Sequence, residues 1–301
     1  MMTPRKMLPF TAGALLLLLP WFGGLTSGEL SDKKFTMCQK FFYKRTPPRG
    51  FGTGHKAICQ RYKNKYRFAT LYDRQKRTAL FSAYLMSSSN EPRPDGTWMY
   101  EPQLVSKTAD PEMKPFPNPV GQNMKNSQAV PEDYTNNNYT KGHLAPSQHL
   151  NTEDDRTSSF TLTNIVPQKA ESNNGPWSDL ETEVLRRFNT YCNGQMYVLT
   201  GTIPYKSKCL LKGRVSIPEY IWSAYCCPSF KSDLPNDTRI FFPTHGAWGR
   251  NGPCPDNNTV EENPSPYAVR RVSLPRLQRF LRERLGMTGS LFSGDCQSPK
   301  P

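Results

Sequence analysis

Eight cysteines, all downstream of an apolar N-terminal run, restrict the folds open to this chain. An even number of cysteines in an exported chain indicates a disulfide framework, and the spacings do not choose among the pairings. Zinc binding is the competing interpretation, but no two cysteines have the C-x2-C spacing and the intervals are irregular. We expect adjacent Cys226 and Cys227 to bond to different partners, because a ring between neighbours is strained. The remaining cysteines are Cys38, Cys59, Cys192, Cys209, Cys254 and Cys296.

The first 28 residues have the layout of a cleaved signal peptide. A short positive region precedes an almost unbroken apolar run from Leu8 to Leu19, and small residues lead to Gly28, after which we expect cleavage. The run is too short for a membrane anchor, which needs about 20 apolar residues. No later segment is apolar enough to cross a bilayer. We therefore predict a secreted protein without stable membrane association.

Residues 29–301 are predicted to form one domain with disulfide-tied N- and C-terminal extensions. Three glycosylation sequons, at Asn138, Asn236 and Asn257, fit a secretory route. Loss of the leader removes two of 39 lysines and arginines, so 37 face 25 acidic residues and the net charge is +12. Such a charge favours polyanions as partners, although a solubilising surface is the alternative. The pattern indicates no oligomeric state.

Hydrophobic patterning predicts an α+β fold, with a mixed or antiparallel central sheet and flanking helices. Residues 29–65 are expected to be loop-rich, and residues 87–132, dense in proline, to form a long irregular excursion. A helix is expected near the C-terminus, capped by Ser273, with Pro275 in its first turn and Gly286 at its end. Its leucine stripe favours docking on a sheet. The expected strands are Tyr66–Tyr72, Ala79–Met86, Met196–Thr202, Tyr220–Tyr225 and Thr238–Phe242.

Three short motifs follow one another in the middle of the chain. They read YTKGHLAP at 139–146, TNIVPQ at 163–168 and NNGPW at 173–177, and Glu181 comes shortly after. Together they resemble the DNA/RNA non-specific endonuclease family, whose signature is D-R-G-H with apolar-A-P, then T-N-x-x-P-Q, then N-x-G-x-W. The resemblance implies a ββα-metal finger core. It also implies a metal-dependent hydrolase that cuts DNA and RNA without sequence specificity.

His143 is the predicted general base. Phosphodiester hydrolysis needs an activated water, and a neutral imidazole is a natural base near neutral pH. Gly142, directly before it, would let the backbone approach a phosphate closely. A lone Gly-His pair would more often mark a packed structural histidine, and the neighbouring motifs favour catalysis. The other histidines are His55, His149 and His245.

Asn173 and Glu181 are the predicted metal-site residues. The Asn173 carbonyl is a hard oxygen donor suited to Mg²⁺, which keeps several waters and takes few protein ligands. A turn-forming asparagine before Gly175 is the alternative. If a helix starts near Pro176, then Glu181 lies on or beside its apolar face, which is formed by Trp177, Leu180, Val184 and Phe188. A carboxylate there needs a partner, such as Lys141 or water on a metal, unless it reaches solvent.

The resemblance implies a role for each matching residue. His143 would deprotonate the attacking water. Asn173 would hold Mg²⁺, or another divalent cation such as Mn²⁺, which stabilises the developing charge. Glu181 would orient water on the metal, and Asn164 would support the site from behind.

Two positions depart from the family pattern. Lys141 stands where the family has arginine, and it lacks the planar two-pronged donor; Arg93 is the candidate for the upstream arginine that grips phosphate. Thr140 replaces the family aspartate, so a carboxylate is missing near the metal, and it completes the sequon at Asn138. A weakened or silent nuclease-like protein that binds polyanions or a protein partner is therefore the alternative. A basic matrix-binding or glycan-binding module would leave the motifs unexplained. Since His143, Asn173 and Glu181 remain, we favour activity.

Overall fold

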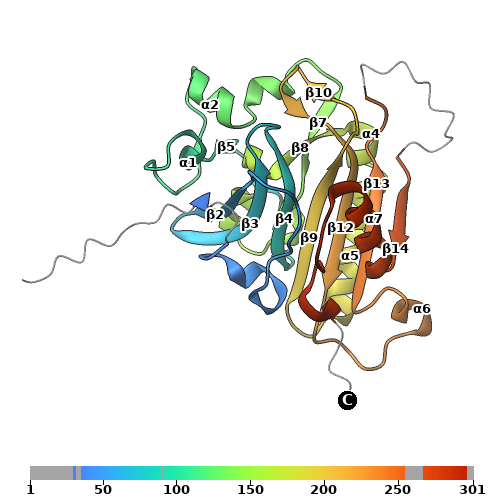
Figure 1. The fold of residues 1–301 in the computed structure, drawn as a ribbon. Coiled ribbons are helices and arrows are strands. Elements are labelled where there is room, and N and C mark those ends of the chain that lie inside the picture. The colour runs from blue at the N-terminus through green and yellow to red at the C-terminus, as the bar shows by residue number, and fades with distance from the viewer. Residues whose placement is uncertain (1–29, 32–34, 90, 255–266, 297–301) are drawn as a thin grey trace, which may run out of the picture.

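The computed structural model describes residues 30–31, 35–89, 91–254 and 267–296. Their main feature is an eight-stranded antiparallel sheet in the order β1-β2-β3-β4-β9-β12-β13-β14 (Figure 1). This confirms the predicted α+β class, and of the two predicted sheet types, mixed or antiparallel, the sheet is antiparallel. The strands are β1 Leu30–Ser31, β2 Lys56–Tyr62, β3 Lys65–Asp73, β4 Thr78–Met86, β9 Met196–Pro204, β12 Pro218–Cys226, β13 Thr244–Arg250 and β14 Val269–Val272.

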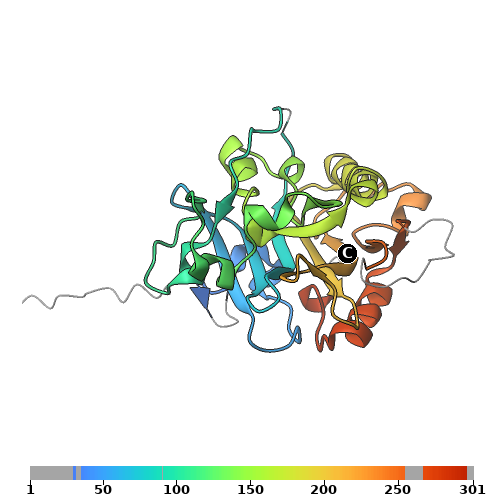
Figure 2. The same cartoon turned by 90° about the horizontal axis from the view of Figure 1, so that it is seen from above.

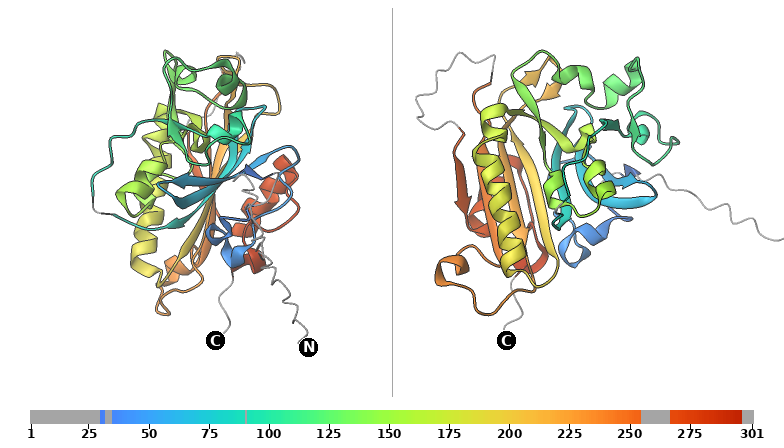
Figure 3. Two further views of the ribbon diagram at one scale, coloured as in Figure 1. Left: turned by 90° about the vertical axis from the view of Figure 1, so that its left-hand side faces the viewer. Right: turned by 180° about the vertical axis from the view of Figure 1, so that it is seen from behind.

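The two faces of this sheet are covered by different parts of the chain. Because side chains alternate along a strand, Phe81 and Ala83 of β4 enter one core while Ser82 and Tyr84 point to the other side. The edge-on view of Figure 3 shows α7 and the N-terminal segment on one face and α5 on the opposite face. Figure 2 gives the same separation from above.

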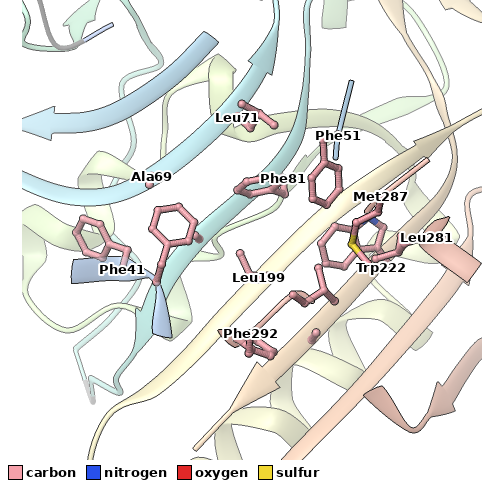
Figure 4. Close-up of a cluster of buried hydrophobic side chains, with 14 of the residues drawn as sticks. Phe41, Phe51, Ala69, Leu71, Phe81, Leu199, Trp222, Leu281, Met287 and Phe292 are labelled. Atoms are coloured by element: carbon pink, nitrogen blue, oxygen red, sulfur yellow. The ribbon is translucent and has the colours of Figure 1, made fainter. Parts of the chain in front are cut away.

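The first face carries the helix predicted near the C-terminus, α7 (Leu274–Leu285). Leu277 and Leu281 are fully buried in a cluster that includes Phe81 and Trp222 (Figure 4). Docking on the sheet is therefore confirmed. Gly286 ends the helix with a positive φ of 69°, as expected of a C-terminal glycine. Ser273 occupies the N-cap position, but its side chain makes no capping hydrogen bond.

The second face carries a ββα unit. Strands β7 (Tyr139–His143) and β8 (Ile165–Lys169) pair antiparallel. The short helix α4 (Ala170–Asn173) and then α5 (Pro176–Tyr191) follow. Trp177, Leu180 and Val184 of α5 are buried against the sheet, and Phe188 packs beside them, so the predicted apolar face is present.

Two predictions of secondary structure are wrong. The segment Thr238–Phe242 is not a strand: it holds the end of α6 (Asn236–Arg239) and a turn, and Ile240 is 68% exposed. Strand β13 begins only at Thr244, after Pro243, because proline cannot donate to a sheet ladder. Residues 29–65 are not wholly loop-rich either, since β2 lies within them and pairs with β3.

The proline-rich excursion is mostly irregular, as predicted. It contains only short elements: β5 Met99–Tyr100, α1 Pro102–Val105, β6 Lys114–Pro115, α2 Gln122–Ser127 and the start of the 3-10 turn η3 Pro131–Tyr134. The other short elements are η1 Gln39–Phe41, η2 Tyr43–Arg45, η4 Ser147–His149, α3 Glu153–Ser158, η5 Leu162–Asn164, β10 Leu210–Leu211, β11 Val215–Ser216 and η6 Ser293–Cys296.

All eight cysteines form disulfides. Adjacent Cys226 and Cys227 do have different partners. The pairs are Cys38–Cys59, Cys192–Cys227, Cys209–Cys254 and Cys226–Cys296. In the part of the chain that the structure describes, no helix combines the length and apolarity needed to cross a bilayer. The leader and the Asn257 sequon lie outside the described residues.

Candidate active site

A cavity of about 350 Å³ brings together five of the predicted site residues. Lys141 and His143 come from β7, Asn173 from α4, Glu181 from α5 and Arg93 from the proline-rich excursion. Thr140 and Asn164, which were predicted to support the site, do not line this cavity. The five predicted residues therefore come from four separate segments of the chain.

His143 is held in an aromatic setting. Its ring lies 5.8 Å from the ring of Trp98 and meets Phe160 edge-on at 5.3 Å. Its Nε2 atom is buried and has no hydrogen-bond partner in the described part of the chain. Burial, with a smaller contribution from the nearby Arg93 guanidinium, lowers the pKa of His143 to about 3. The imidazole is therefore neutral at physiological pH and has an unused polar atom.

Two cations without carboxylate partners among the described residues line the same cavity. The Lys141 ammonium lies 5.1 Å from the ring centre of Trp98 and 5.6 Å from that of Tyr134, and burial lowers its pKa. The Arg93 guanidinium lies 5.0 Å from the ring of Phe160. Aromatic faces attract cations but do not neutralise them. An anion entering the cavity would therefore meet two cations that form no ion pair with a described residue, beside Glu91 and Glu181, which line the same cavity.

Thr140 fixes the orientation of the Asn173 amide. The Thr140 hydroxyl donates to the backbone carbonyl of Gln168 at 2.8 Å, so it can only accept from Asn173, whose Nδ2 lies 3.0 Å away. The Asn173 nitrogen is thereby held on the Thr140 side. Its Oδ1 atom has no hydrogen-bond partner in the described residues and remains for a ligand of the cavity.

Gly142 packs closely against a neighbouring side chain inside the β7–β8 hairpin. A Cβ atom there would lie 2.2 Å from Oε1 of Gln168, which belongs to the paired strand β8 and lies opposite Thr140. Gln168 in turn donates to the Ser172 hydroxyl, near Asn173. The glycine therefore permits close packing inside the hairpin, and no contact of its backbone with a phosphate is needed to explain it.

Glu181 is held from two sides. The Gln148 side-chain amide donates to the Glu181 carboxylate at 3.0 Å. The sequence analysis named Lys141 as a candidate partner and did not name Gln148. His149 Nε2 donates to the Glu181 backbone carbonyl at 3.0 Å, so its Nδ1 accepts from the Tyr84 hydroxyl at 2.8 Å. Burial raises the pKa of the Glu181 carboxyl to about 8, against weaker opposing effects of Gln148, Trp177 and Arg93.

Asn164 lies fully buried behind the cavity. Its Nδ2 donates to the carbonyls of Ala145 and Ser159, at 2.9 and 3.1 Å. Its Oδ1 accepts from the Ala145 amide at 3.0 Å and from the Ser82 hydroxyl at 2.8 Å. The side chain thus ties the segment that follows His143 to strand β4.

The sequence analysis missed several residues of the cavity. Gln148 lies two residues after the end of the first motif, and this closeness is the only feature of the sequence that points to it as a site residue. Arg156, from α3, is buried at the cavity lining and donates to the Glu91 carbonyl at 2.7 Å, and no motif marks it. Trp98 and Phe160 were likewise invisible as contacts of His143, because they come from distant loops.

The model of the DNA/RNA non-specific endonuclease family matches residues 50–262. The chain belongs to this family. Human "Endonuclease domain-containing 1 protein" is 32% identical over 71% of the chain, and the mouse protein of the same name is 34% identical over 64%. The chain spans 43% and 39% of the lengths of these relatives. The crystal structure of the EndoG/EndoGI complex is similar over 73% of this chain and 82% of that one, with 18% identity and a TM-score of 0.47.

Nucleases of this family are generally dependent on a divalent metal. In the described residues no group of three or more histidines, cysteines or carboxylates is arranged to hold a metal. The free Oδ1 atom of Asn173 is nevertheless a hard oxygen donor, and Glu181 lines the same cavity. Mg²⁺ binds with few protein ligands and completes its shell with water and phosphate oxygens. The residues present therefore fit a hydrated divalent cation better than a fully protein-coordinated metal.

Proposed function

We propose that this protein is a secreted endonuclease that hydrolyses phosphodiester bonds in DNA and RNA without sequence specificity. The observation that carries the proposal is the shared cavity of His143 and Asn173. There an unpartnered imidazole nitrogen and an unpartnered amide oxygen lie beside Lys141 and Arg93, two cations that form no ion pair within the described residues. Membership of the nuclease family supports the same conclusion.

The chemistry of the site follows from its charges. Lys141 and Arg93 attract the phosphate, and the neutral His143 accepts the proton of the attacking water. An anion beside an imidazole favours its protonated form, so the bound phosphate raises the low pKa of His143 and makes it a stronger base. Asn173 would bind Mg²⁺ or Mn²⁺, which supplies charge stabilisation at the phosphate and the leaving oxygen.

Glu181 has a positioning role in this proposal. Its backbone is fixed to the sheet through His149 and Tyr84, and its carboxylate is fixed by Gln148. The Glu181 carboxyl would ionise more readily beside a bound divalent cation, which would offset the effect of burial on its pKa. The ionised group then accepts hydrogen bonds from water in the cavity and holds it near His143.

Digestion of plasmid and RNA by the purified protein tests this function. Cutting is expected with Mg²⁺ or Mn²⁺, to stop in EDTA, and to fall by about 10²–10⁴-fold in His143→Ala. His55→Ala, which changes a histidine in a different cavity beside α7, is the matched control and should leave cutting intact. Digestion that persists in His143→Ala would contradict the assignment of the base.

The alternative function is a silent relative that binds polyanions or a protein partner. It is favoured by Thr140 in place of the family aspartate and by the exposed sequon residue Asn138 beside it. Retained binding of DNA without cutting, with every divalent metal tested, would establish this alternative. We still favour activity, because Thr140 accepts a hydrogen bond from Asn173 and does not line the cavity.

Secretion and glycosylation form the remaining part of the proposal. The four disulfides need an oxidising compartment. Asn138 and Asn236 are exposed and therefore accessible to a glycan. Expression of the full chain in animal cells should deliver protein to the medium, beginning at Glu29, with a mass that falls on glycosidase treatment. Retention of the uncleaved leader would contradict this part.

A further inference from the structure

A second and larger depression lies beside the ββα unit. It has a volume of about 930 Å³ and is lined by the turn before β7, the end of β8 and the β10–β11 hairpin. Three of its lining residues are lysines, Lys169, Lys208 and Lys212, and none is acidic. We call this depression the lysine groove.

The positive charge of the lysine groove is not neutralised by ion pairs. None of the three lysines pairs with a carboxylate in the described part of the chain. Lys212 donates to two neutral acceptors, the Glu132 carbonyl at 2.6 Å and the Thr135 hydroxyl at 3.1 Å. Lys169 lies 4.4 Å from the ring centre of Tyr139. Lys208 is exposed. The groove is thus suited to an anion and is too large for a single phosphate.

The groove has a rigid floor. Leu211 and Ile217 line it and belong to a buried apolar cluster that also contains Tyr139. The disulfide Cys209–Cys254 joins the same cluster and fixes the chain next to the hairpin. Holding Lys212 and Lys169 on a fixed surface reduces the entropy that a ligand must remove on binding.

Strand β7 connects the lysine groove with the catalytic cavity. Tyr139 lines the groove, and Lys141 and His143 line the cavity. Alternate residues of a strand share one side, so these three side chains form a row, and four residues of strand extend about 13 Å. A chain of phosphates lying along this row would leave the catalytic cavity and enter the groove.

We propose that the lysine groove binds the backbone of the nucleic-acid strand a few nucleotides beyond the scissile phosphate. The inference rests on the proposed function, because it takes the cavity at His143 as the point of cleavage. Contacts of lysines with phosphates carry no sequence information, which suits a non-specific nuclease. Each contact releases counterions and makes binding weaker as salt rises.

The sequon residue Asn138 lies in the wall of the same groove. A glycan on Asn138 would occupy the space proposed for the strand. Binding is therefore measured in an Asn138→Gln background, which removes the sequon and leaves the Thr140 hydroxyl in place. Comparison with glycosylated protein then gives a second readout: removal of a glycan from this position should tighten binding of long strands and leave short ones unaffected.

The test separates binding from cutting by using His143→Ala in EDTA, with fluorescent single-stranded DNA of two or twelve nucleotides. Changing Lys169, Lys208 and Lys212 to glutamine should weaken binding of the twelve-mer and reduce its log–log salt slope by about 2, since each contact contributes about 0.7 on single strands. Binding of the dinucleotide should not change. The matched control is glutamine at Lys40, Lys44 and Lys231, three exposed lysines outside the groove.

Three results would overturn the proposal: an unchanged salt slope in the groove variant, equal loss in the control variant, or no binding of the twelve-mer by the starting protein. A heparin fragment that loses affinity in the groove variant while DNA does not would assign the groove to sulfated glycans and also refute the proposal. Loss of cutting has no influence on these readouts. A chain that binds through the groove but never cuts would therefore retain strand binding by the lysine groove and lose both the proposed function and the position relative to a scissile phosphate.

Discussion

The two faces of the central sheet use the same strands for different purposes. On the α7 face, β4, β9 and β12 contribute Phe81, Leu199 and Trp222 to an apolar core. The disulfides Cys38–Cys59 and Cys226–Cys296 belong to the same core. On the α5 face the same strands contribute Ser82, Thr200 and Ser223. The hydroxyls of Thr200 and Ser223 are hydrogen-bonded to each other, and the Ser82 hydroxyl donates to Asn164.

This difference separates stability from positioning. Apolar burial is non-directional and tolerates small shifts, whereas a buried hydrogen bond fixes the direction of its partners. Both faces therefore supply apolar cohesion, and the α5 face in addition holds the motif residues in place through buried hydrogen bonds. Variants on each face should affect different measurements, and the following four test that separation in order of decreasing expected effect.

The largest effect is expected from Leu277→Ala on the α7 face. Leu277 is fully buried, and truncation of a buried leucine costs about 2–5 kcal/mol of unfolding free energy. Cutting per folded molecule should stay unchanged. Denaturant unfolding with the disulfides intact measures the first quantity. Leu285→Ala, at a partly exposed position of the same helix, should cost less. Equal losses would show that this face is not a source of cohesion.

Asn164→Ala is the counterpart on the α5 face. It leaves the amide and carbonyl of Ala145 without their partner, at about 1–3 kcal/mol for each buried group. Because Ala145 lies two residues after His143, cutting per folded molecule should fall about tenfold or more. Ser82→Ala removes only one of the bonds and should have a smaller effect on both. Unchanged cutting in Asn164→Ala would remove its positioning role.

Thr140→Val should reduce kcat/KM by up to about tenfold, because one hydrogen bond of about 0.5–1.5 kcal/mol no longer orients Asn173. Thr140→Ser keeps the hydroxyl and should behave like the parent. Both are compared in an Asn138→Gln background, since valine also destroys the sequon. If valine and serine act alike, the Thr140 hydroxyl does not position the amide.

The smallest effect concerns the pH dependence of stability. The pKa of Glu181 in the folded protein, about 8, exceeds its ordinary value of 4.5. The contribution of the protonated carboxyl to stability is therefore fully present below about pH 4.5 and is lost as the pH rises through 8. Glu181→Gln should therefore raise Tm at pH 9 by a few degrees and hardly change it at pH 4 in EDTA. Glu183→Gln should lower Tm at neutral pH, because Glu183 pairs with Arg187 and Arg271. A Tm of Glu181→Gln below the parent at pH 9 would contradict the burial argument.

Much of the scaffold could be predicted because its signals are local. The mostly apolar run Ala79–Met86 is a local signal of a buried strand, and the leucine spacing before Gly286 is a local signal of a helix with one buried face. The prediction failed at Thr238–Phe242, where β-forming residues are followed by Pro243 and the core offers a place to Phe242 but not to Ile240. Such a choice depends on neighbours that are distant in sequence.

The sequence alone determined the inventory of the site: an imidazole, an amide and a carboxylate at characteristic intervals, together with a helix face that carries Glu181. Only the tertiary structure decided how these groups are held. Gln148 and not Lys141 holds the Glu181 carboxylate, and Thr140 turns the Asn173 oxygen toward the cavity. Trp98 and Phe160 desolvate His143. The reason is physical, since residue spacing fixes the face on which a side chain lies, whereas its hydrogen bonds and desolvation depend on segments brought together only by folding.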